Sequence, residues 1–262
     1  MKVSIITLTN NSEKNIHRCL ESIHNQNYSN IEHIIIDNKS SDNTVKIINN
    51  YKNKRIKLIS EKDNGIYDGW NKGFKLATGD IVGTVMSDDF LVEKNIIEQI
   101  VDIFKKKQPD MVYGNMQFTK DGEIIRKWIS GNYSKYKFYF GWMPPPPTVY
   151  HTKKIIDENE LFDTSLKISA DYEFYLRLFF KKNYKIIYLN KFIYNLEYGG
   201  VSNKSLINIF KSNVESYKSW GKNNLFNIPT FILVKPLFKI FQIINFRFFI
   251  KKYSTFSLKK KI

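Results

Sequence analysis

The stretch IEHIIIDNKSSDNT, residues 31–44, sets the expectation for the fold. Its first half, Ile31–Asp37, is apolar and β-branched, which predicts a buried strand that ends in an acid. Ser40–Asp42 supplies the residue types that commonly cap helices, and apolar positions at helical spacing follow from Val45. The stretch therefore predicts a strand that leads directly into a helix.

The same alternation extends on both sides of this stretch. Upstream, Val3–Leu8 predicts a strand and Ser12–Gln26 predicts a helix. Downstream, the sequence predicts a strand, a helix and another strand at Ile56–Ser60, Ile66–Leu76 and Ile81–Met86. Such alternation is typical of an α/β domain, in which helices cover both faces of a mostly parallel sheet.

Polar side chains follow each of these predicted strands. The carboxyl ends of parallel strands meet at one edge of the sheet, which is where open α/β sheets bind ligands. We therefore expect a site built from the residues at these four strand ends: Thr7, Thr9 and Asn10; Asp37; Glu61 and Asp63; and Asp88 and Asp89.

The composition indicates a folded protein and excludes several classes. Of the 262 residues, 42% are hydrophobic and 15% are aromatic, which is too apolar for a disordered chain. Cys19 is the only cysteine, so a disulfide framework is excluded. Residues 1–11 lack the apolar core of a signal peptide, and no apolar run reaches the roughly 18 residues of a membrane span.

The net charge of +16 raises the question of an anionic partner. Only five of the 41 basic residues are Arg, and no nucleic-acid reader motif is present, so we do not expect a nucleic-acid partner. The charge is uneven, because ten Lys+Arg and no acid lie from Ser216 onward.

Glycine is absent before Gly65, which bears on phosphate binding. The glycine-rich loops of dinucleotide-binding and Walker-type sites are therefore excluded after the first strand. A nucleoside diphosphate would need a divalent cation instead, and Asp88 and Asp89 offer the carboxylate oxygens that Mg²⁺ prefers. On the residues alone, a pair that begins a turn or caps the next helix is the favoured interpretation.

Four segments in a fixed order resemble glycosyltransferase family 2: Val3–Asn10, Ile34–Thr44, Ser60–Tyr67 with Asn71–Gly73, and Ser87–Asp89. The resemblance covers about residues 1–120 and continues loosely through Tyr113-Gly114, Pro144–Pro147, Ser169–Glu173 and Gly199–Ser202. It implies the GT-A fold, a Rossmann-like mixed, mostly parallel sheet flanked by helices, here with a helical carboxy-terminal tail. It also implies an inverting enzyme that uses a nucleotide sugar, similar to bacterial enzymes of O-antigen, capsule or exopolysaccharide synthesis.

Roles for individual residues follow from the resemblance. Asp171 would be the catalytic base, with Glu173 in reserve, although Asp171 could also be a helix N-cap. Asp89 as first choice, together with Asp88, would hold a divalent metal, Mn²⁺ or Mg²⁺. The donor would contact a set that spans the four strand ends: Thr7, Thr9, Asn10, Asp37, Ser40, Asp63, Gly65, Asn71, Gly73 and Asp88.

Three positions depart from the family's pattern. Lys39 and Asn43 stand where glycine is usual, and Met86 occupies the first acidic or amide position of the metal motif. Asn tolerates left-handed backbone better than Lys does. Trp142, beside the proline loop, could stack on an acceptor sugar or could hold that loop in place from a buried position.

We expect three parts along the chain: a donor-binding half at 1–110, an acceptor and base half at 111–225, and a basic tail at 226–262. In the tail, Leu237, Ile240, Phe241, Ile244 and Phe248 recur at helical spacing. A basic amphipathic helix suits the surface of an anionic membrane, although a helix packed on the domain is the alternative. We therefore expect a cytoplasmic protein, peripheral on the inner face of the cytoplasmic membrane.

The resulting hypothesis is transfer of a hexose or N-acetylhexosamine from a UDP-sugar to a hydroxyl of a lipid-linked oligosaccharide. The alternatives are a transferase that uses a GDP- or dTDP-sugar, and a non-catalytic carbohydrate-binding or assembly protein on the same fold.

Overall fold

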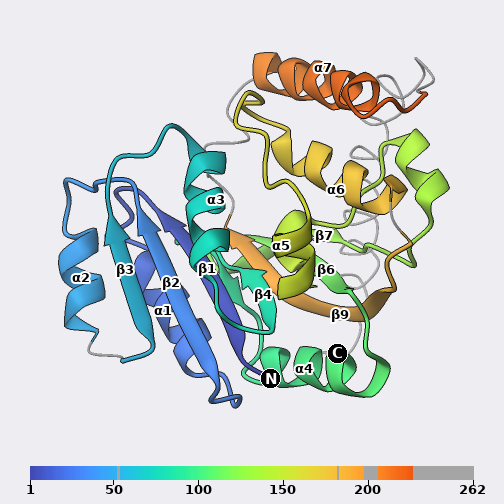
Figure 1. Cartoon of the computed structure of the whole chain (residues 1–262). Coiled ribbons are helices and arrows are strands. Elements are labelled where there is room, and N and C mark those ends of the chain that lie inside the picture. The colour runs from blue at the N-terminus through green and yellow to red at the C-terminus, as the bar shows by residue number, and fades with distance from the viewer. Residues whose placement is uncertain (52–53, 182, 198–205, 227–262) are drawn as a thin grey trace, which may run out of the picture.

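The computed structural model describes residues 1–51, 54–181, 183–197 and 206–226. Within these residues, nine strands form one sheet in the order β3-β2-β1-β4-β8-β6-β9-β5, and β7 pairs with β6 (Figure 1). The expected mixed α/β architecture is confirmed.

The amino-terminal half builds the parallel part of the sheet. The strands β1 (Val3–Thr9), β2 (Ile31–Asp37), β3 (Ile56–Ser60) and β4 (Ile81–Thr84) are parallel, and α1 (Ile16–His24), α2 (Thr44–Asn50) and α3 (Ile66–Leu76) connect them. The helix expected from Ser12 begins at Ile16, because the backbone N–H groups of Ser12 and Glu13 donate to the side chains of Thr44, the first residue of α2, and of Asp42 in the loop before it.

The carboxy-terminal half adds the remaining strands. Its elements are β5 (Phe90–Leu91), α4 (Ile96–Lys107), β6 (Met111–Lys120), β7 (Glu123–Trp128), the 3₁₀ helices η1 (Lys135–Phe140) and η2 (Pro146–Thr148), β8 (Tyr150–Thr152), α5 (Lys153–Glu158), α6 (Ala170–Lys181), β9 (Ile186–Glu197) and α7 (Leu206–Lys222). Since β8 is antiparallel to both β4 and β6, the strands β6 and β9 run in the direction of β1–β4.

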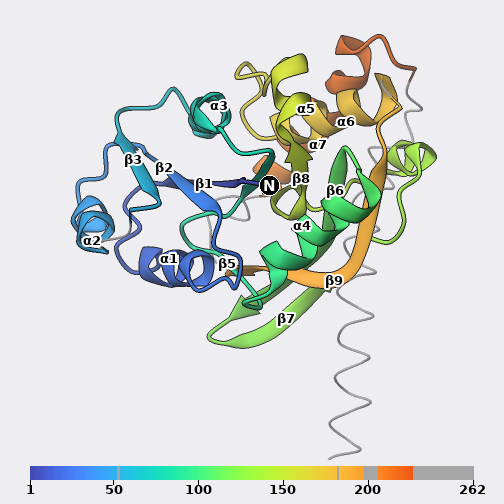
Figure 2. The ribbon, with the colours of Figure 1, turned by 60° about the horizontal axis from the view of Figure 1, so that its bottom comes forward.

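Helices cover both faces of the sheet (Figures 1 and 2). The helices α3, α5 and α6 lie on one face, where Phe74 and Phe174 belong to one buried apolar cluster. The other face carries α1, α2 and α4, whose residues Leu20, Ile48 and Ile100 belong to a second cluster. The sheet therefore separates two apolar cores.

No helix among the described residues is both long enough and apolar enough to cross a membrane. Residues 227–262, which hold the predicted amphipathic tail, lie outside the described residues, as does the Gly199–Ser202 segment.

Candidate active site

The carboxyl ends of β1, β2 and β3 lie side by side, as the sequence predicted. In the parallel register Thr9 pairs with Asp37, and Asp37 pairs with Ser60. The loop after β2 reaches the next wall of the site, because Asn38 Oδ1 accepts a hydrogen bond from the backbone N–H of Asp63 at 2.8 Å.

The loop after β1 connects these strand ends to the end of β4. Asn10 Nδ2 donates to the backbone oxygen of Asn38 at 2.8 Å, and Ser12 Oγ lies 2.8 Å from Ser87 Oγ. Ser87 immediately precedes Asp88. The four strand ends therefore form one hydrogen-bonded polar edge, which we call the rim.

Asp37 is fully buried and organises its own loop. Its carboxylate accepts hydrogen bonds from the backbone N–H of Ser40 at 3.0 Å, from Ser60 Oγ at 2.5 Å and from Ser40 Oγ. Ser40 Oγ in turn accepts from the backbone N–H of Asn11 at 2.8 Å. With 0% exposure, Asp37 shapes the rim from beneath.

Two loop corners of the rim have left-handed backbone. Lys39 has φ +49° and Asn11, in the facing loop, has φ +50°. This conformation costs a residue with a side chain roughly 1–2 kcal/mol, which glycine avoids. The left-handed backbone at position 39 therefore explains why the family's pattern has glycine there. Asn43 has φ −76°, which any residue adopts, so no such reason applies there.

Thr7 and Thr9 are both buried in β1. Thr7 Oγ1 donates to the backbone oxygen of Val85 at 2.6 Å and lies 2.9 Å from His33 Nε2, so it joins β1 to the end of β4. Thr9 Oγ1 is buried without a hydrogen-bond partner among the described residues. Of the two hydroxyls, that of Thr9 retains unused hydrogen-bonding capacity at the rim.

The start of α3 forms one wall of the rim. Gly65 has φ +118°, and no described atom lies within 4 Å of the position that a Cβ would occupy. Gly73, two turns later, has the opposite surroundings, because a Cβ there would lie 2.4 Å from Ile6 Cγ2. Gly65 is thus required for the turn, and Gly73 for the close approach of α3 to β1.

Lys72 gathers three carboxylates on this wall. Its Nζ lies 2.8 Å from Glu61 Oε1, 2.8 Å from Asp63 Oδ1 and 3.4 Å from Asp68 Oδ2. Hydrogen bonds to Asp63 and Glu61 raise the pKa of Lys72 above its usual value. The Asp63 side chain is 7% exposed, so its carboxylate is held in one place.

Asn71 binds protein backbone on the side of α3 that faces the cavity near α6. Its Nδ2 donates to the backbone oxygen of Phe162 at 2.8 Å, and its Oδ1 accepts from the N–H of Phe162 at 2.9 Å. Both ends of the carboxamide are therefore used to hold the segment that leads to α6.

The two carboxylates after β4 have different surroundings. Asp89 is 3% exposed, and its oxygens accept hydrogen bonds from Tyr194 Oη at 2.7 Å and from the N–H of Glu197 at 3.1 Å. Burial, together with the charge of Asp88, raises the pKa of Asp89 to about 8. Asp88 is half-buried, and burial also raises its pKa, partly offset by the charge of Arg18.

A divalent cation fits this arrangement through Asp88. No cluster of three or more His, Cys, Asp or Glu side chains within the described ranges could hold a metal. Mg²⁺ and similar hard cations commonly use one or two carboxylates together with substrate phosphates. The Asp88 carboxylate, which burial makes costly to keep charged, is suited to that role.

Asp171 is half-buried in the first turn of α6, as its second residue, and thus is not the N-cap residue. Tyr67 Oη, on α3, lies 3.4 Å from Asp171 Oδ1 and donates to the backbone oxygen of Ile168 at 2.7 Å. Burial and the charge of Asp171 raise the pKa of Tyr67. The structure thus brings Asp171 to the wall formed by α3.

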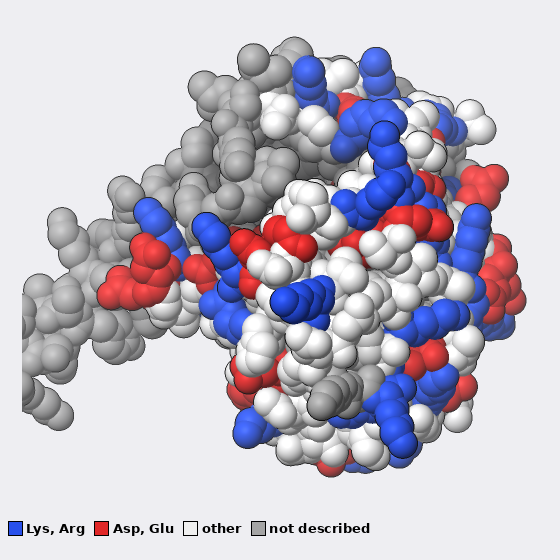
Figure 3. Space-filling model, turned by 90° about the vertical axis from the view of Figure 1, so that its left-hand side faces the viewer, with Lys and Arg blue, Asp and Glu red and all other residues white. Residues whose placement is uncertain are grey.

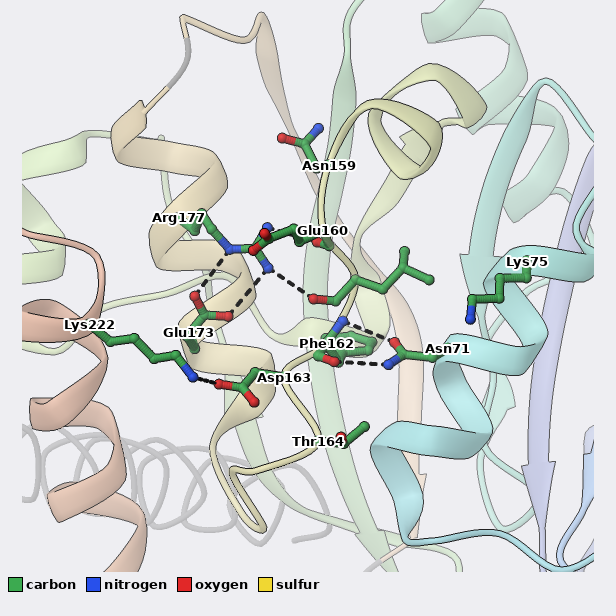
Figure 4. A pocket seen from close by; sticks show the side chains of 11 residues that line it. Asn71, Lys75, Asn159, Glu160, Phe162, Asp163, Thr164, Glu173, Arg177 and Lys222 are labelled. Atoms are coloured by element: carbon green, nitrogen blue, oxygen red, sulfur yellow. Dashed lines mark hydrogen bonds and ion pairs between the residues drawn. The ribbon is translucent and has the colours of Figure 1, made fainter.

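Glu173 belongs to a cavity of about 620 Å³ between α3, α6 and the end of α7 (Figure 4). Arg177 Nε lies 3.1 Å from Glu173 Oε1, which also accepts from Asn223 Nδ2 at 2.9 Å. Lys222 pairs with Asp163 across the same cavity. Glu173 is 3% exposed and neutralised by Arg177, which leaves Asp171 as the better base candidate.

Trp142 is half-buried and contacts the segment before the proline loop. Its Nε1 donates to the backbone oxygen of Ser130 at 2.8 Å, and its ring packs edge-on against buried Phe138 with centroids 5.5 Å apart.

Sequence reasoning missed Lys72, Tyr194 and Arg18 as parts of the site. Arg18 Nη2 donates to the backbone oxygen of Asp88 at 3.2 Å and pairs with Glu197 Oε2 at 2.9 Å. Glu197 lies 179 positions from Arg18, so only the fold brings them together. The one sequence signal was the spacing Asp68–Lys72, a helical ion pair.

The chain is similar in sequence to known proteins. The family model described as Glycosyl transferase family 2 matches residues 4–162. The chain is 31% identical to a chondroitin synthase of Escherichia coli over 74% of this chain, and it spans only 28% of that protein. It is 34% identical, over 78% of this chain and 69% of the relative, to a dolichyl N-acetyl-alpha-D-glucosaminyl phosphate 3-beta-D-2,3-diacetamido-2,3-dideoxy-beta-D-glucuronosyltransferase of Methanococcus voltae.

Two solved structures share the fold. S. aureus TarS 1-349 in complex with UDP-GlcNAc matches with a TM-score of 0.65 and 21% identity, over 84% of this chain and 69% of that one. The mannosyltransferase PcManGT from Pyrobaculum calidifontis, in complex with GDP-Man and Mn²⁺, matches with a TM-score of 0.62 and 14% identity, over 89% and 68%. The expected GT-A fold is confirmed. Because the family model matches more than half of the residues of this chain, the chain belongs to glycosyltransferase family 2.

Proposed function

We propose that this chain transfers a hexose or N-acetylhexosamine from a UDP-sugar to a hydroxyl of a lipid-linked saccharide, with inversion at the anomeric carbon. The observation that carries the proposal is the rim, where the ends of β1–β4 are joined by hydrogen bonds and lie next to the wall that positions Asp171. A nucleoside would lie along this edge and its diphosphate would extend toward Asp88.

Donor binding would use the side chains that the rim leaves available. The hydroxyl of Thr9 is buried without a partner among the described residues, and Gly65 exposes backbone at an open turn. Lys72 holds the Asp63 carboxylate at the end of the site where the nucleobase would bind. Asp37, Ser40, Asn71 and Gly73 would act indirectly, by shaping the loops and the position of α3. Support for a UDP-linked donor comes from the TarS complex, whose ligand is UDP-GlcNAc.

The metal proposal places the cation on Asp88, with Asp89 behind it. Tyr194 and Glu197 occupy the carboxylate of Asp89, so the half-buried Asp88 would be the residue that holds the cation. When bound, Mn²⁺ or Mg²⁺ stabilises the negative charge that develops on the leaving diphosphate. A Mn²⁺ complex of a protein with the same fold supports this choice.

The chemistry at Asp171 would be general-base catalysis. The acceptor hydroxyl loses its proton to the Asp171 carboxylate while its oxygen forms a bond to the anomeric carbon, and the bond from that carbon to the diphosphate oxygen breaks. A base positioned in this way typically contributes about 10²–10⁴-fold. Tyr67 would hold the Asp171 carboxylate in place from α3.

A lipid-linked acceptor and a peripheral position on the inner membrane face remain part of the proposal. The Methanococcus voltae relative carries a dolichyl phosphate substrate in its name, which supports a lipid carrier. Synthesis of O-antigen, capsule or another surface polysaccharide would use such acceptors.

The test is the thermal stability of the full chain with UDP, GDP or dTDP, each with Mn²⁺ or EDTA. A ligand at 100 times its dissociation constant adds about 2.7 kcal/mol to stability. Stabilisation by UDP that needs Mn²⁺ is expected. Stabilisation by GDP or dTDP alone would assign another donor, and no stabilisation by any of them would contradict the proposal.

A further inference from the structure

A carboxylate of α7 binds the backbone of the segment that leads into α6. Glu215 Oε2 accepts hydrogen bonds from the N–H of Ile168 at 2.9 Å and from the N–H of Ser169 at 2.8 Å. Its other oxygen, Oε1, accepts from the N–H of Lys167 at 3.2 Å. One carboxylate therefore holds three consecutive N–H groups, although it lies 46–48 positions further along the chain. We call residues 167–169 the α6 entry.

The setting of Glu215 differs from that of a carboxylate on the molecular surface. On the face seen in Figure 3, acidic and basic side chains are mixed and meet solvent. Glu215 is half-buried, and its contacts with the α6 entry are to backbone donors. Hydrogen bonds from backbone N–H groups at the start of a helix to a carboxylate are charge-assisted and stronger than those between neutral groups. Glu215 is therefore suited to hold the α6 entry in one conformation.

The main chain of Ile168 is held by two helices. Its N–H donates to Glu215 on α7, and its backbone oxygen accepts from Tyr67 Oη on α3 at 2.7 Å. The same Tyr67 hydroxyl lies 3.4 Å from Asp171 Oδ1. A shift of the α6 entry would therefore move Asp171 relative to the wall formed by α3.

The helix α7 also binds residues on both sides of Asp171, and Figure 1 shows it beside α6. Ser169 Oγ lies 2.8 Å from Ser212 Oγ and donates to the backbone oxygen of Ser212 at 3.1 Å. After Asp171, Tyr172 Oη accepts a hydrogen bond from Trp220 Nε1 at 3.0 Å. Asp171 therefore lies between two residues whose side chains are fixed by α7.

We propose that Glu215 is a positioning residue for Asp171, and that it places the Asp171 carboxylate by fixing the α6 entry. The inference rests on the proposed role of Asp171 as the base. A base must lie within hydrogen-bond reach of the proton that it removes, and a misplacement of about 1 Å can lower a rate about 10²-fold. Since Asp171 lies two residues beyond Ser169, release of the α6 entry would displace it.

The test measures UDP release from UDP-GlcNAc by the full chain with Mn²⁺, with water as the acceptor. The water oxygen bonds to the anomeric carbon, its proton passes to Asp171, and the bond from that carbon to UDP breaks. Glu215→Ala is expected to lower kcat about tenfold or more, while the Kd of UDP stays the same. Glu215→Gln keeps one carbonyl oxygen that can accept from Ile168 and Ser169, so it should retain most of the parent's kcat.

A double-mutant cycle separates positioning from a general loss of stability. In the Asp171→Asn background, Glu215→Ala should lower kcat less than about twofold, because the group that Glu215 positions is already absent. A second readout is hydrogen exchange of the N–H groups at 167–169, which Glu215→Ala should speed about tenfold or more. The matched control is Glu32→Ala, which removes a carboxylate that accepts from the N–H of Thr78 at 2.7 Å, and it should change neither kcat nor this exchange.

Equal kcat in the parent and in Glu215→Ala would overturn the inference, as would unchanged exchange at 167–169. So would an equally large loss of kcat in the Asp171→Asn background, or in Glu32→Ala, because the effect would then not act through Asp171. Absence of UDP release by the parent would contradict the proposed function instead, and the exchange measurement would then decide whether Glu215 fixes the α6 entry.

Discussion

The hydroxyl of Tyr67 on α3 lies 3.4 Å from the carboxylate of Asp171 on α6, although 104 positions separate them in the sequence. The same hydroxyl donates to the backbone oxygen of Ile168 at 2.7 Å, which fixes its position. One side chain therefore connects the wall of the proposed donor site to the proposed base.

This contact predicts a graded effect on turnover. Tyr67→Phe removes a hydroxyl that donates to the backbone oxygen of Ile168 and lies 3.4 Å from the Asp171 carboxylate, and we expect kcat to fall about fivefold, equivalent to about 1 kcal/mol. Asp171→Asn should lower kcat about 10²–10⁴-fold. The Kd of UDP, measured by calorimetry, should stay the same in both variants. Full turnover by Asp171→Asn would remove this residue from the role of base.

Lys72 should influence nucleotide affinity through Asp63. Lys72→Met leaves Glu61, Asp63 and Asp68 without their shared cation, so the Asp63 carboxylate loses its fixed position. We expect the Kd of UDP to rise about tenfold while kcat at saturating donor changes little. Lys75→Met, on the same helix, is the matched control, because Lys75 forms no ion pair with a described residue. Equal affinities for both variants would contradict the positioning role.

Much of the rim could be predicted because local patterns determine it. Strand ends such as Asp37 and Asp88 are visible as apolar runs that stop at acids, and parallel topology then brings them together. The predicted strands and helices of the first half are all present, with α1 starting four residues later than expected.

The remaining parts depend on contacts between distant segments. Tyr194 and Glu197, over 100 positions away, donate hydrogen bonds to the Asp89 carboxylate and keep it buried. The sequence does not show which of the two neighbouring carboxylates they bind. Asn71 looks like a donor contact in sequence, but Phe162 occupies both ends of its carboxamide. No local pattern reports such pairings, because they follow from how the second half packs on the first.

Backbone geometry predicts a stabilising substitution at position 39. Since Lys39 has φ +49°, Lys39→Gly should raise the free energy of unfolding by about 1 kcal/mol, measured by urea denaturation. Asn43→Gly is the control and should lower it by about 1 kcal/mol, because Asn43 has φ −76°, glycine adds freedom to the unfolded chain, and the hydrogen bond from Asn43 Nδ2 to Glu13 Oε2 is lost. A loss of stability in Lys39→Gly would show that the lysine side chain does more than occupy the corner.

Stability should fall in mild acid because of buried histidine. Burial lowers the pKa of His151 to about 4, so the folded protein keeps it neutral while the unfolded chain binds a proton below about pH 6.5. Between pH 7 and pH 5 this group alone should remove about 2 kcal/mol of stability. Urea midpoints of the parent and of His151→Phe at both pH values measure it. An equal pH dependence in the variant would exclude His151 as the source.

Calorimetric titration of UDP into the parent chain and into Asp88→Asn, each with Mn²⁺ and with EDTA, tests the central claim most directly. We predict that Mn²⁺ tightens UDP binding to the parent at least tenfold, equivalent to about 1.4 kcal/mol. Asp88→Asn should lose this gain and keep the metal-free affinity. Equal gains in parent and variant, or no UDP binding by the parent, would contradict a metal-assisted donor site at the rim.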